Sequence, residues 1–206
     1  MGLTDTVDQN GNQKHFDDGK NRVVIYNPET GEFEVLKDTN GDNMTVNQYN
    51  ELIATIYAET LGSTESENGG IMNVILNRAT YSKRTIMDII RNTGIYGNSS
   101  TTQNQVFSRL QGISNAWISW CKIRNIRKGI ANAISGGSDY SGGAYFWEGR
   151  QYLNAKNYPN NFFTLNGWGK NKGTITGTIT FNVTVTRGGT VFMQYNSATV
   201  GSLIWP

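Results

Sequence analysis

Two kinds of hydrophobic periodicity divide this chain, and their positions constrain its fold more than any other feature. Across most of residues 45–136, apolar residues recur three and four apart, which is typical of amphipathic helices. Residues 23–36 and 174–195 instead contain short runs rich in Val, Ile, Thr and aromatic residues, which are typical of strands. The sequence therefore predicts an α+β chain with a mainly helical body and β hairpins near both termini.

Four helices are predicted within the central stretch. The first has the clearest beginning, because Thr45 and Gln48 have the three-residue spacing of a capping box. Behind this box, apolar residues recur on one side of the helix as far as Gly62, which is typical of a C-terminal stop. The four expected helices extend over about 45–62, 67–79, 85–91 and 114–136.

The remaining segments contain fewer apolar residues. Residues 1–21 are polar throughout, and we expect a poorly ordered lead-in there, before the first hairpin. Residues 92–113 consist mainly of Gly, Ser, Thr, Gln and Asn, which predicts a long loop. We divide the chain into residues 1–44, a lead-in and hairpin that form a candidate docking segment, and residues 45–206, the main domain. Near its end, Arg187-Gly188-Gly189 predicts the turn of the second hairpin.

The inventory of side chains excludes several classes of chemistry. The chain has 18 Lys and Arg against 16 Asp and Glu, and this near-balance argues against a nucleic-acid-binding protein. Its single histidine, His15, and single cysteine, Cys121, do not supply the three or four ligands of a usual zinc site. The sequence also lacks a phosphate-binding loop and a dinucleotide fingerprint. We therefore expect no metal, no cofactor, and a chemistry based on carboxylates.

Glu59 is the carboxylate whose position best suits acid catalysis. It lies three residues after Ile56 and seven after Leu52, so it projects from the apolar side of the first predicted helix. It also falls in the last turn, where the negative end of the helix dipole disfavours a carboxylate charge. Both effects are expected to raise its pKa toward that of a general acid near neutral pH. The alternative is that Glu59 reaches solvent at the edge of the stripe, or pairs with Arg78.

Four separate segments carry a combined signature. Residues 56–62 read Ile-Tyr-Ala-Glu-Thr-Leu-Gly, and residues 69–78 read Gly-Gly-Ile-Met-Asn-Val-Ile-Leu-Asn-Arg. Residues 139–146 read Asp-Tyr-Ser-Gly-Gly-Ala-Tyr-Phe, and residues 187–192 read Arg-Gly-Gly-Thr-Val-Phe. In this order they resemble the spore cortex-lytic and bacterial cell wall hydrolase family. Its segments read Tyr-Ala-Glu-Ala, Gly-Gln with an aliphatic helix ending Asn-Arg, Asp-Pro-Thr-Gly-Gly-Ala, and Ile-Gly-Asn-His-Val-Phe.

The resemblance implies that residues 45–206 form a lysozyme-like catalytic domain. Such a domain acts on peptidoglycan as a muramidase or lytic transglycosylase, cleaving between N-acetylmuramic acid and N-acetylglucosamine. Glu59 corresponds to the catalytic acid, which in the lytic branch then takes the proton of the muramic acid 6-hydroxyl. Gly70 and Thr190 stand where the family has Gln and His, so the roles of those two side chains do not carry over. Ordinary glycosidases use a second carboxylate, for which the candidates are Glu65, Glu67, Asp139 and Glu148.

Rings and amides elsewhere in the chain are candidates for sugar recognition. Asn73 lies on the helix that follows Glu59 and is a candidate ligand for an acetamido group or for the acid itself. Aromatic side chains can stack on sugar faces, although each fits a hydrophobic core as well. The candidates for stacking are Tyr145, Phe146, Trp147 and Trp168.

A second interpretation is a non-catalytic glycan-binding or structural module of a phage tail or injection apparatus. Residues 1–6 lack the cationic start and apolar run of a secretory signal, and no stretch has the length of a membrane span. We therefore expect synthesis in the cytoplasm and action on the cell wall after lysis or delivery by a particle or secretion machine. The expected partners are peptidoglycan glycan strands, and a phage or contractile injection particle or an immunity protein, but neither nucleic acid nor membrane.

Overall fold

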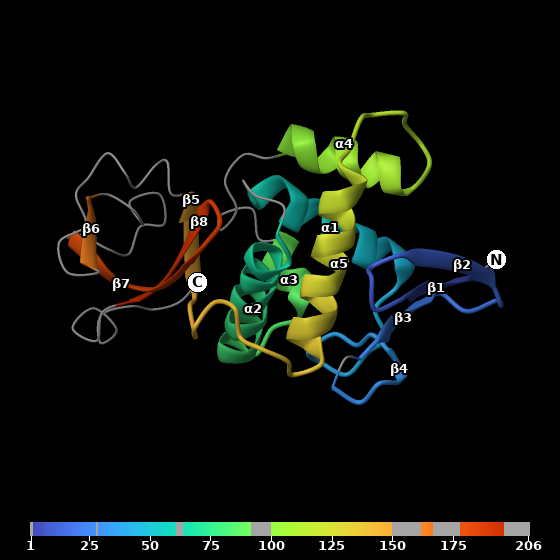
Figure 1. Ribbon diagram of the computed structural model, residues 1–206, viewed down its shortest axis with the longest axis horizontal. Helices are drawn as coiled ribbons and strands as arrows, with labels where there is room; N and C mark the ends of the chain where they lie inside the picture. The colour runs from blue at the N-terminus through green and yellow to red at the C-terminus, as the bar shows by residue number, and fades with distance from the viewer. Residues whose placement is uncertain are drawn as a thin grey trace.

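The computed structural model describes residues 2–27, 29–60, 64–91, 100–149, 162–166 and 178–195. Within these ranges, five helices lie between two four-stranded sheets, one built from the N-terminal strands and one from the C-terminal strands (Figure 1). This arrangement confirms the α+β class and the placement of strands near both ends of the chain.

The N-terminal sheet has the strand order β2-β1-β3-β4. The predicted hairpin is confirmed, since β3 and β4 are antiparallel neighbours, and β1 lies parallel to β3 on its other side. The strands are β1 (Leu3–Val7), β2 (Gln13–Asp17), β3 (Arg22–Tyr26) and β4 (Phe33–Val35).

The expectation of a poorly ordered lead-in over residues 1–21 is wrong, because its polar side chains satisfy one another. Asp5 of β1 has no exposed surface, and its Oδ1 lies 2.5 Å from His15 Nδ1 on the paired strand. Its second oxygen accepts a hydrogen bond from Gln13 Nε2. Val7 is also buried and joins the main hydrophobic core. A strand with few apolar residues therefore forms through cross-strand partners and pairing with β3.

α1 (Val46–Glu59) begins where the sequence predicts. Thr45 Oγ1 accepts from the Gln48 backbone N–H at 3.2 Å, and Gln48 Oε1 accepts from the Thr45 N–H at 2.8 Å, so the capping box is confirmed. α2 (Glu65–Ser82) is longer than predicted, because Thr64 caps it by accepting from the Glu67 N–H. α3 (Ile86–Arg91) matches its predicted range.

Two expectations about the second half of the helical body are wrong. The predicted loop over 92–113 contains α4 (Ser100–Leu110), which packs on α1 through the buried Val106 and a 2.7 Å hydrogen bond from Gln103 Nε2 to Thr55 Oγ1. Tertiary packing therefore overrides a weak apolar pattern. α5 (Trp120–Ile134) begins five residues later than Ser114 would place it, with Ser119 as its N-cap. Cys121 consequently lies in the first turn of α5 rather than within its middle.

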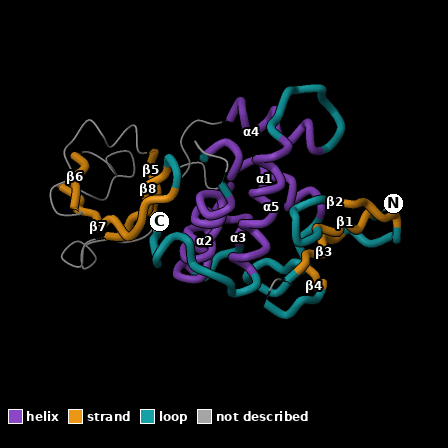
Figure 2. The backbone as a smooth tube through the Cα atoms, in the orientation of Figure 1, coloured by secondary structure: helices purple, strands orange, loops and turns teal. Residues whose placement is uncertain are grey.

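The main core lies where α1, α2 and α5 meet (Figure 2). Two glycines set the distance between α2 and α5, since a Cβ on Gly129 would lie 2.6 Å from the backbone nitrogen of Gly69. Side chains with no exposed surface fill the space around this crossing; they include Tyr49, Leu52, Ile56, Ile71, Ile75, Ile126 and Ile130.

The C-terminal sheet has the strand order β5-β8-β7-β6, with antiparallel neighbours throughout. The predicted hairpin around Gly188 is confirmed, and this glycine adopts a positive φ of 55° in the turn between β7 and β8. Phe192 of β8 is fully buried against α2, where its ring occupies the space that a side chain on Gly70 would need. The strands are β5 (Phe146–Gly149), β6 (Phe162–Asn166), β7 (Thr178–Arg187) and β8 (Thr190–Tyr195).

None of the helices in the described ranges is both long enough and apolar enough to cross a membrane.

Candidate functional site

Glu59 is the last residue of α1 and is half-buried at a junction of several chain segments. Lys122 of α5 donates a 2.7 Å hydrogen bond to the carbonyl of Thr60, the residue after Glu59, and lies 4.4 Å from the centre of the Tyr57 ring. The backbone N–H of Ser119 donates to the Tyr57 hydroxyl at 3.0 Å. The C-terminal turn of α1 is therefore fixed against the N-terminal turn of α5.

Glu67, in the first turn of α2, adds a fully buried carboxylate to this junction. Its Oε1 accepts a hydrogen bond from the Thr190 hydroxyl at 2.7 Å and one from the Gly189 backbone N–H at 3.2 Å. A Cβ on Gly188 would lie 2.6 Å from Glu67 Oε2, so only a glycine lets the β7–β8 turn approach this closely. These contacts attach the C-terminal sheet to the beginning of α2.

The Gly/Ser/Thr-rich sequence around Glu67 predicts a solvated side chain, and this prediction is wrong. α2 begins at Glu65 rather than at residue 67, so Glu67 lies one helical turn before the buried Gly70 and Ile71 and faces the same side. We use "the junction" below for the segments that meet around these contacts: residues 56–60, 64–67, 119–122 and 187–190.

The charge state of the junction depends on Lys122. Burial lowers the pKa of this ammonium group to about 8, and the attraction of the Glu67 carboxylate opposes part of that decrease. A lysine in this range changes its charge close to neutral pH, unlike an ordinary surface lysine. The electrostatic field next to the end of α1 therefore changes at mildly alkaline pH.

A second set of contacts connects α2 with the loop before β5. Asn73 is 7% exposed, and its Oδ1 accepts from the Tyr140 backbone N–H at 3.0 Å. One helical turn after Asn73, Asn77 Nδ2 donates to the Ala144 carbonyl at 2.9 Å. The next residue, Arg78, donates from Nε to the Tyr145 carbonyl at 2.6 Å. Asn73, a candidate for binding the acetamido group or the acid, is thus engaged in holding this loop.

Asp139 organises the same loop. One of its oxygens accepts from the backbone N–H and the hydroxyl of Ser141, at 2.8 and 2.6 Å, and the other accepts from the Gly143 N–H at 2.6 Å. Gly142 and Gly143 both adopt positive φ angles in this turn. The carboxylate of Asp139 is therefore used in shaping the loop that binds to α2.

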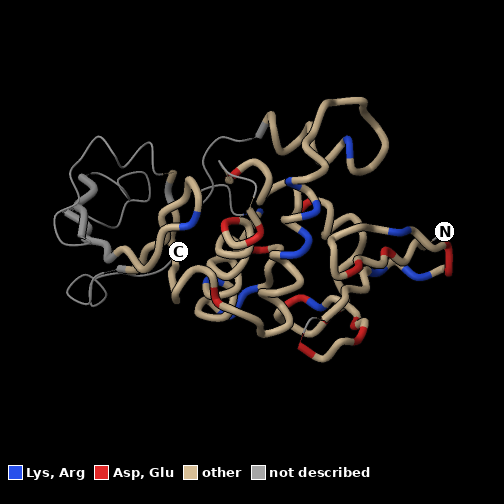
Figure 3. Tube along the Cα trace, in the orientation of Figure 1, with Lys and Arg blue, Asp and Glu red and all other residues tan. Residues whose placement is uncertain are grey.

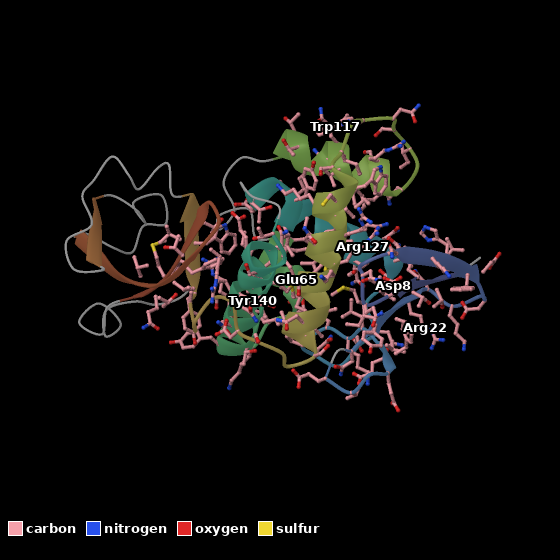
Figure 4. The ribbon with its side chains drawn as sticks, viewed as in Figure 1. Asp8, Arg22, Glu65, Trp117, Arg127 and Tyr140 are labelled. Carbon is pink, nitrogen blue, oxygen red and sulfur yellow. The ribbon has the colours of Figure 1, made fainter. Side chains whose placement is uncertain are left out.

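Glu65 forms an ion pair on the outer side of α2, where its Oε2 lies 2.6 Å from Lys128 Nζ of α5. Tyr140 is its neighbour (Figure 4), and burial together with the Glu65 carboxylate raises the pKa of the Tyr140 hydroxyl. Basic positions of α5 lie between the acidic beginning of α2 and the N-terminal sheet (Figure 3). The side chain of Glu148, the other candidate second carboxylate, lies outside the described residues.

The candidate aromatic residues at β5 surround Arg78. Phe146 is 5% exposed and its ring centre lies 4.8 Å from the guanidinium carbon, while the half-buried Trp147 ring lies 5.3 Å from it. Tyr145 packs edge-on against Tyr81, with the ring centres 5.8 Å apart. The rings of Phe146 and Trp147 therefore pack on the guanidinium group of one buried arginine of α2. Trp168, the fourth candidate, lies outside the described residues.

Sequence reasoning missed two members of the junction, Lys122 and Thr190, as partners of the site. Lys122 was missed because it lies in a stretch of α5 rich in Lys and Arg, a composition typical of a solvated surface. Thr190 forms its bond to a residue more than a hundred positions earlier, which no local pattern indicates. Glu67 did leave a signal, since Thr64 and Glu67 have capping-box spacing.

The chain matches no protein-family model, no curated protein sequence and no solved structure. Within the described residues, no group of three or more His, Cys, Asp or Glu side chains is arranged to hold a metal ion.

Proposed function

We propose that this chain cleaves the glycan strands of peptidoglycan, with Glu59 as the general acid of a lysozyme-like helical core. The observation that carries the proposal is the meeting, on α2, of three of the four sequence segments on which the family resemblance rests. Residues 69–78 hold the 139–146 loop through Asn73, Asn77 and Arg78. The segment 187–192 packs on the same helix through Phe192. Segments chosen by sequence alone thus form one connected structure.

The position of Glu59 supports the same proposal. A general acid must hold its proton near neutral pH and still face the substrate. Glu59 is half-buried, so it is partly desolvated and yet accessible. It is the last residue of α1, where the negative end of the helix dipole disfavours a carboxylate charge. The contacts of Thr60 and Tyr57 with α5 fix the direction in which this turn presents the carboxyl group.

The contacts of the candidate second carboxylates favour the lytic transglycosylase branch over the muramidase branch. Among the candidates whose side chains the structure describes, Glu65 is paired with Lys128, Glu67 is buried and hydrogen-bonded to Thr190, and Asp139 shapes its own loop. A reaction run by one carboxyl group fits this arrangement. Glu59 first gives its proton to the glycosidic oxygen, and then takes the proton of the muramic acid 6-hydroxyl as that oxygen closes on the anomeric carbon.

The experiment that tests this proposal compares two isosteric changes on the same helix. Glu59→Gln is expected to abolish the loss of turbidity of purified cell walls. Glu51→Gln serves as the matched control, because Glu51 is paired with Arg91 on the surface side of α1, and is expected to leave clearing unchanged. Clearing by a folded Glu59→Gln protein at the wild-type rate would refute the assignment.

Exposed tryptophans favour a second candidate, the non-catalytic glycan-binding module. Trp117 is 87% exposed and Trp120 is 48% exposed. Indole rings usually stabilise a protein by being buried, so exposed ones are candidates for contact with a ligand. Sedimentation with insoluble peptidoglycan separates the two candidates. Wild-type protein that sediments with the wall while releasing no soluble fragments would support the binding module and exclude the enzyme.

A further inference from the structure

A pocket of about 390 Å³ lies between α5 and the N-terminal sheet. Its lining on α5 consists of Trp120, Arg124 and Arg127. Its lining on the β1–β2 hairpin consists of Asn12, Gln13 and His15. At 100° per residue, Trp120, Arg124 and Arg127 lie on the opposite side of α5 from Lys122 and Gly129, which face the junction and α2. Figure 4 shows Arg127 toward the sheet and Glu65 on the other side. The pocket thus opens on the side of α5 opposite Lys122 and shares only the first turn of α5 with the junction.

Arg127 is a buried cation of this pocket. Its side chain belongs to a residue that is 6% exposed, and its Nη1 donates to the Gly11 carbonyl at 3.3 Å while its Nη2 donates to Gln13 Oε1. Its Nε has no hydrogen-bond acceptor, and none of the carboxylates in the described ranges forms an ion pair with it. The buried Asp5 carboxylate attracts this guanidinium electrostatically. Of the five N–H donors of a guanidinium, Gly11 and Gln13 take two, and the remaining Nη donors are the ones that an anion in the pocket would use.

Gln13 and His15 fix the orientation of the Arg127 guanidinium and the Asp5 carboxylate. The side-chain amide of Gln13 donates to Asp5 and accepts from Arg127, so both of its ends have partners. His15 Nδ1 lies 2.5 Å from the other oxygen of Asp5. Asp5 thus contacts both side chains and also attracts the Arg127 guanidinium, so the arrangement is organised before a ligand arrives.

The wall of the pocket combines cations with one flat ring. Trp120 is about half exposed, and Arg124 is exposed beside it on the next turn of α5. A guanidinium binds a carboxylate through two parallel hydrogen bonds, and an indole ring packs against the apolar face of a sugar. The volume lies in the range of pockets that bind small molecules.

We propose that this pocket binds an acidic N-acetylated sugar, with its carboxylate on Arg124 and Arg127 and its ring on Trp120. This proposal rests on the proposed function for its physiological ligand, because N-acetylmuramic acid carries a free carboxylate wherever the peptide stem has been removed from the glycan strand. The pocket then holds a part of the wall polymer distinct from the bond that Glu59 cleaves. Asn12, with an amide group at the rim, is a partner for the N-acetyl group.

Calorimetric titration of the full chain with three probes tests this site. N-acetylmuramic acid is expected to bind at least about tenfold more tightly than N-acetylglucosamine, which lacks the carboxylate, since a charge-assisted bidentate contact is lost. Inorganic phosphate is expected to bind more weakly than N-acetylmuramic acid, because it cannot stack on Trp120. Equal affinity for the two sugars, or tighter binding of phosphate, would overturn the proposal.

Variants at the rim locate the binding. Arg124→Ala and Trp120→Ala are each expected to raise the Kd for N-acetylmuramic acid about tenfold or more, and Arg124→Lys is expected to raise it less. Arg84→Ala is the matched control, an exposed arginine at the end of α2 that is expected to leave the Kd unchanged. Both rim side chains are partly or fully exposed, so the variants should fold, which circular dichroism checks. Unchanged binding by Arg124→Ala and Trp120→Ala would refute the site.

Glu59→Gln keeps this test independent of the proposed catalysis. The pocket proposal predicts that Glu59→Gln binds N-acetylmuramic acid with wild-type affinity while cleavage is lost. Retained cleavage by Glu59→Gln, with binding still sensitive to Arg124→Ala, would refute the catalytic assignment and leave the pocket standing. Loss of binding in Glu59→Gln would instead show that the sugar binds at the junction.

Discussion

Replacing Glu67 by alanine tests whether the buried carboxylate joins the C-terminal sheet to the helical body. The change removes the acceptor of two hydrogen bonds, one from the Thr190 hydroxyl and one from the Gly189 N–H. Thr190 is 1% exposed, so water does not replace the lost partner in the folded protein. Both donors then remain buried and unsatisfied.

The magnitude follows from these two bonds. Hydrogen bonds to a charged group contribute about 1.5–3 kcal/mol each, and stranding a buried donor costs a similar amount. Relief from burying the carboxylate offsets part of this, so we expect a net loss of about 3 kcal/mol in the free energy of unfolding. For a chain of this size, that corresponds to a decrease in Tm of about 6–12 °C.

Urea unfolding followed by circular dichroism measures this loss. Glu65→Ala is the matched control, because the contacts of Glu65 with Lys128 and Tyr140 are partly exposed and their loss should cost about 1 kcal/mol or less. Thr190→Val removes one donor, and a double-mutant cycle with Glu67→Ala should give a coupling energy of about 1–3 kcal/mol. A loss under about 1 kcal/mol for Glu67→Ala, or a coupling near zero, would refute this reasoning.

Two further perturbations test the packing and the electrostatics around the junction. Gly129→Ala should destabilise the fold by about 1–3 kcal/mol in urea unfolding, because the added Cβ would lie 2.6 Å from the Gly69 nitrogen; an unchanged midpoint would show that the helices can separate at no cost. The folded pKa of Lys122, about 8, lies below its ordinary value of 10.5, so between these values the unfolded chain binds a proton that the folded chain does not. Stability should therefore rise with pH through that window, and Lys122→Met should remove this part of the rise; identical pH profiles for the two proteins would contradict the buried position of Lys122.

Local signals explain which parts of the fold could be predicted. The capping box of α1 needs only Thr45 and Gln48, three residues apart, and the β7–β8 turn needs only a glycine where φ is positive. Both features are encoded within a few neighbouring residues, so sequence reasoning places them correctly.

The features that sequence reasoning missed depend on distant partners. α4 has few apolar residues and is held by packing on α1, including the bond from Gln103 to Thr55. β1 is polar and depends on Asp5 finding His15 and Gln13 across the strand pair. In the candidate site, the contact of Glu67 with Thr190 joins residues 123 positions apart. Such pairs become visible only when the chain has folded.

The central claim is that Glu59 is the single acid of a glycan-cleaving reaction, and mass analysis of digested peptidoglycan tests it most directly. Wild type and Glu51→Gln are expected to release 1,6-anhydro-muropeptides, and Glu59→Gln is expected to release them at least about a hundredfold more slowly. Products with reducing ends would place the chain in the muramidase branch. Anhydro products released at the wild-type rate by folded Glu59→Gln protein would contradict the claim.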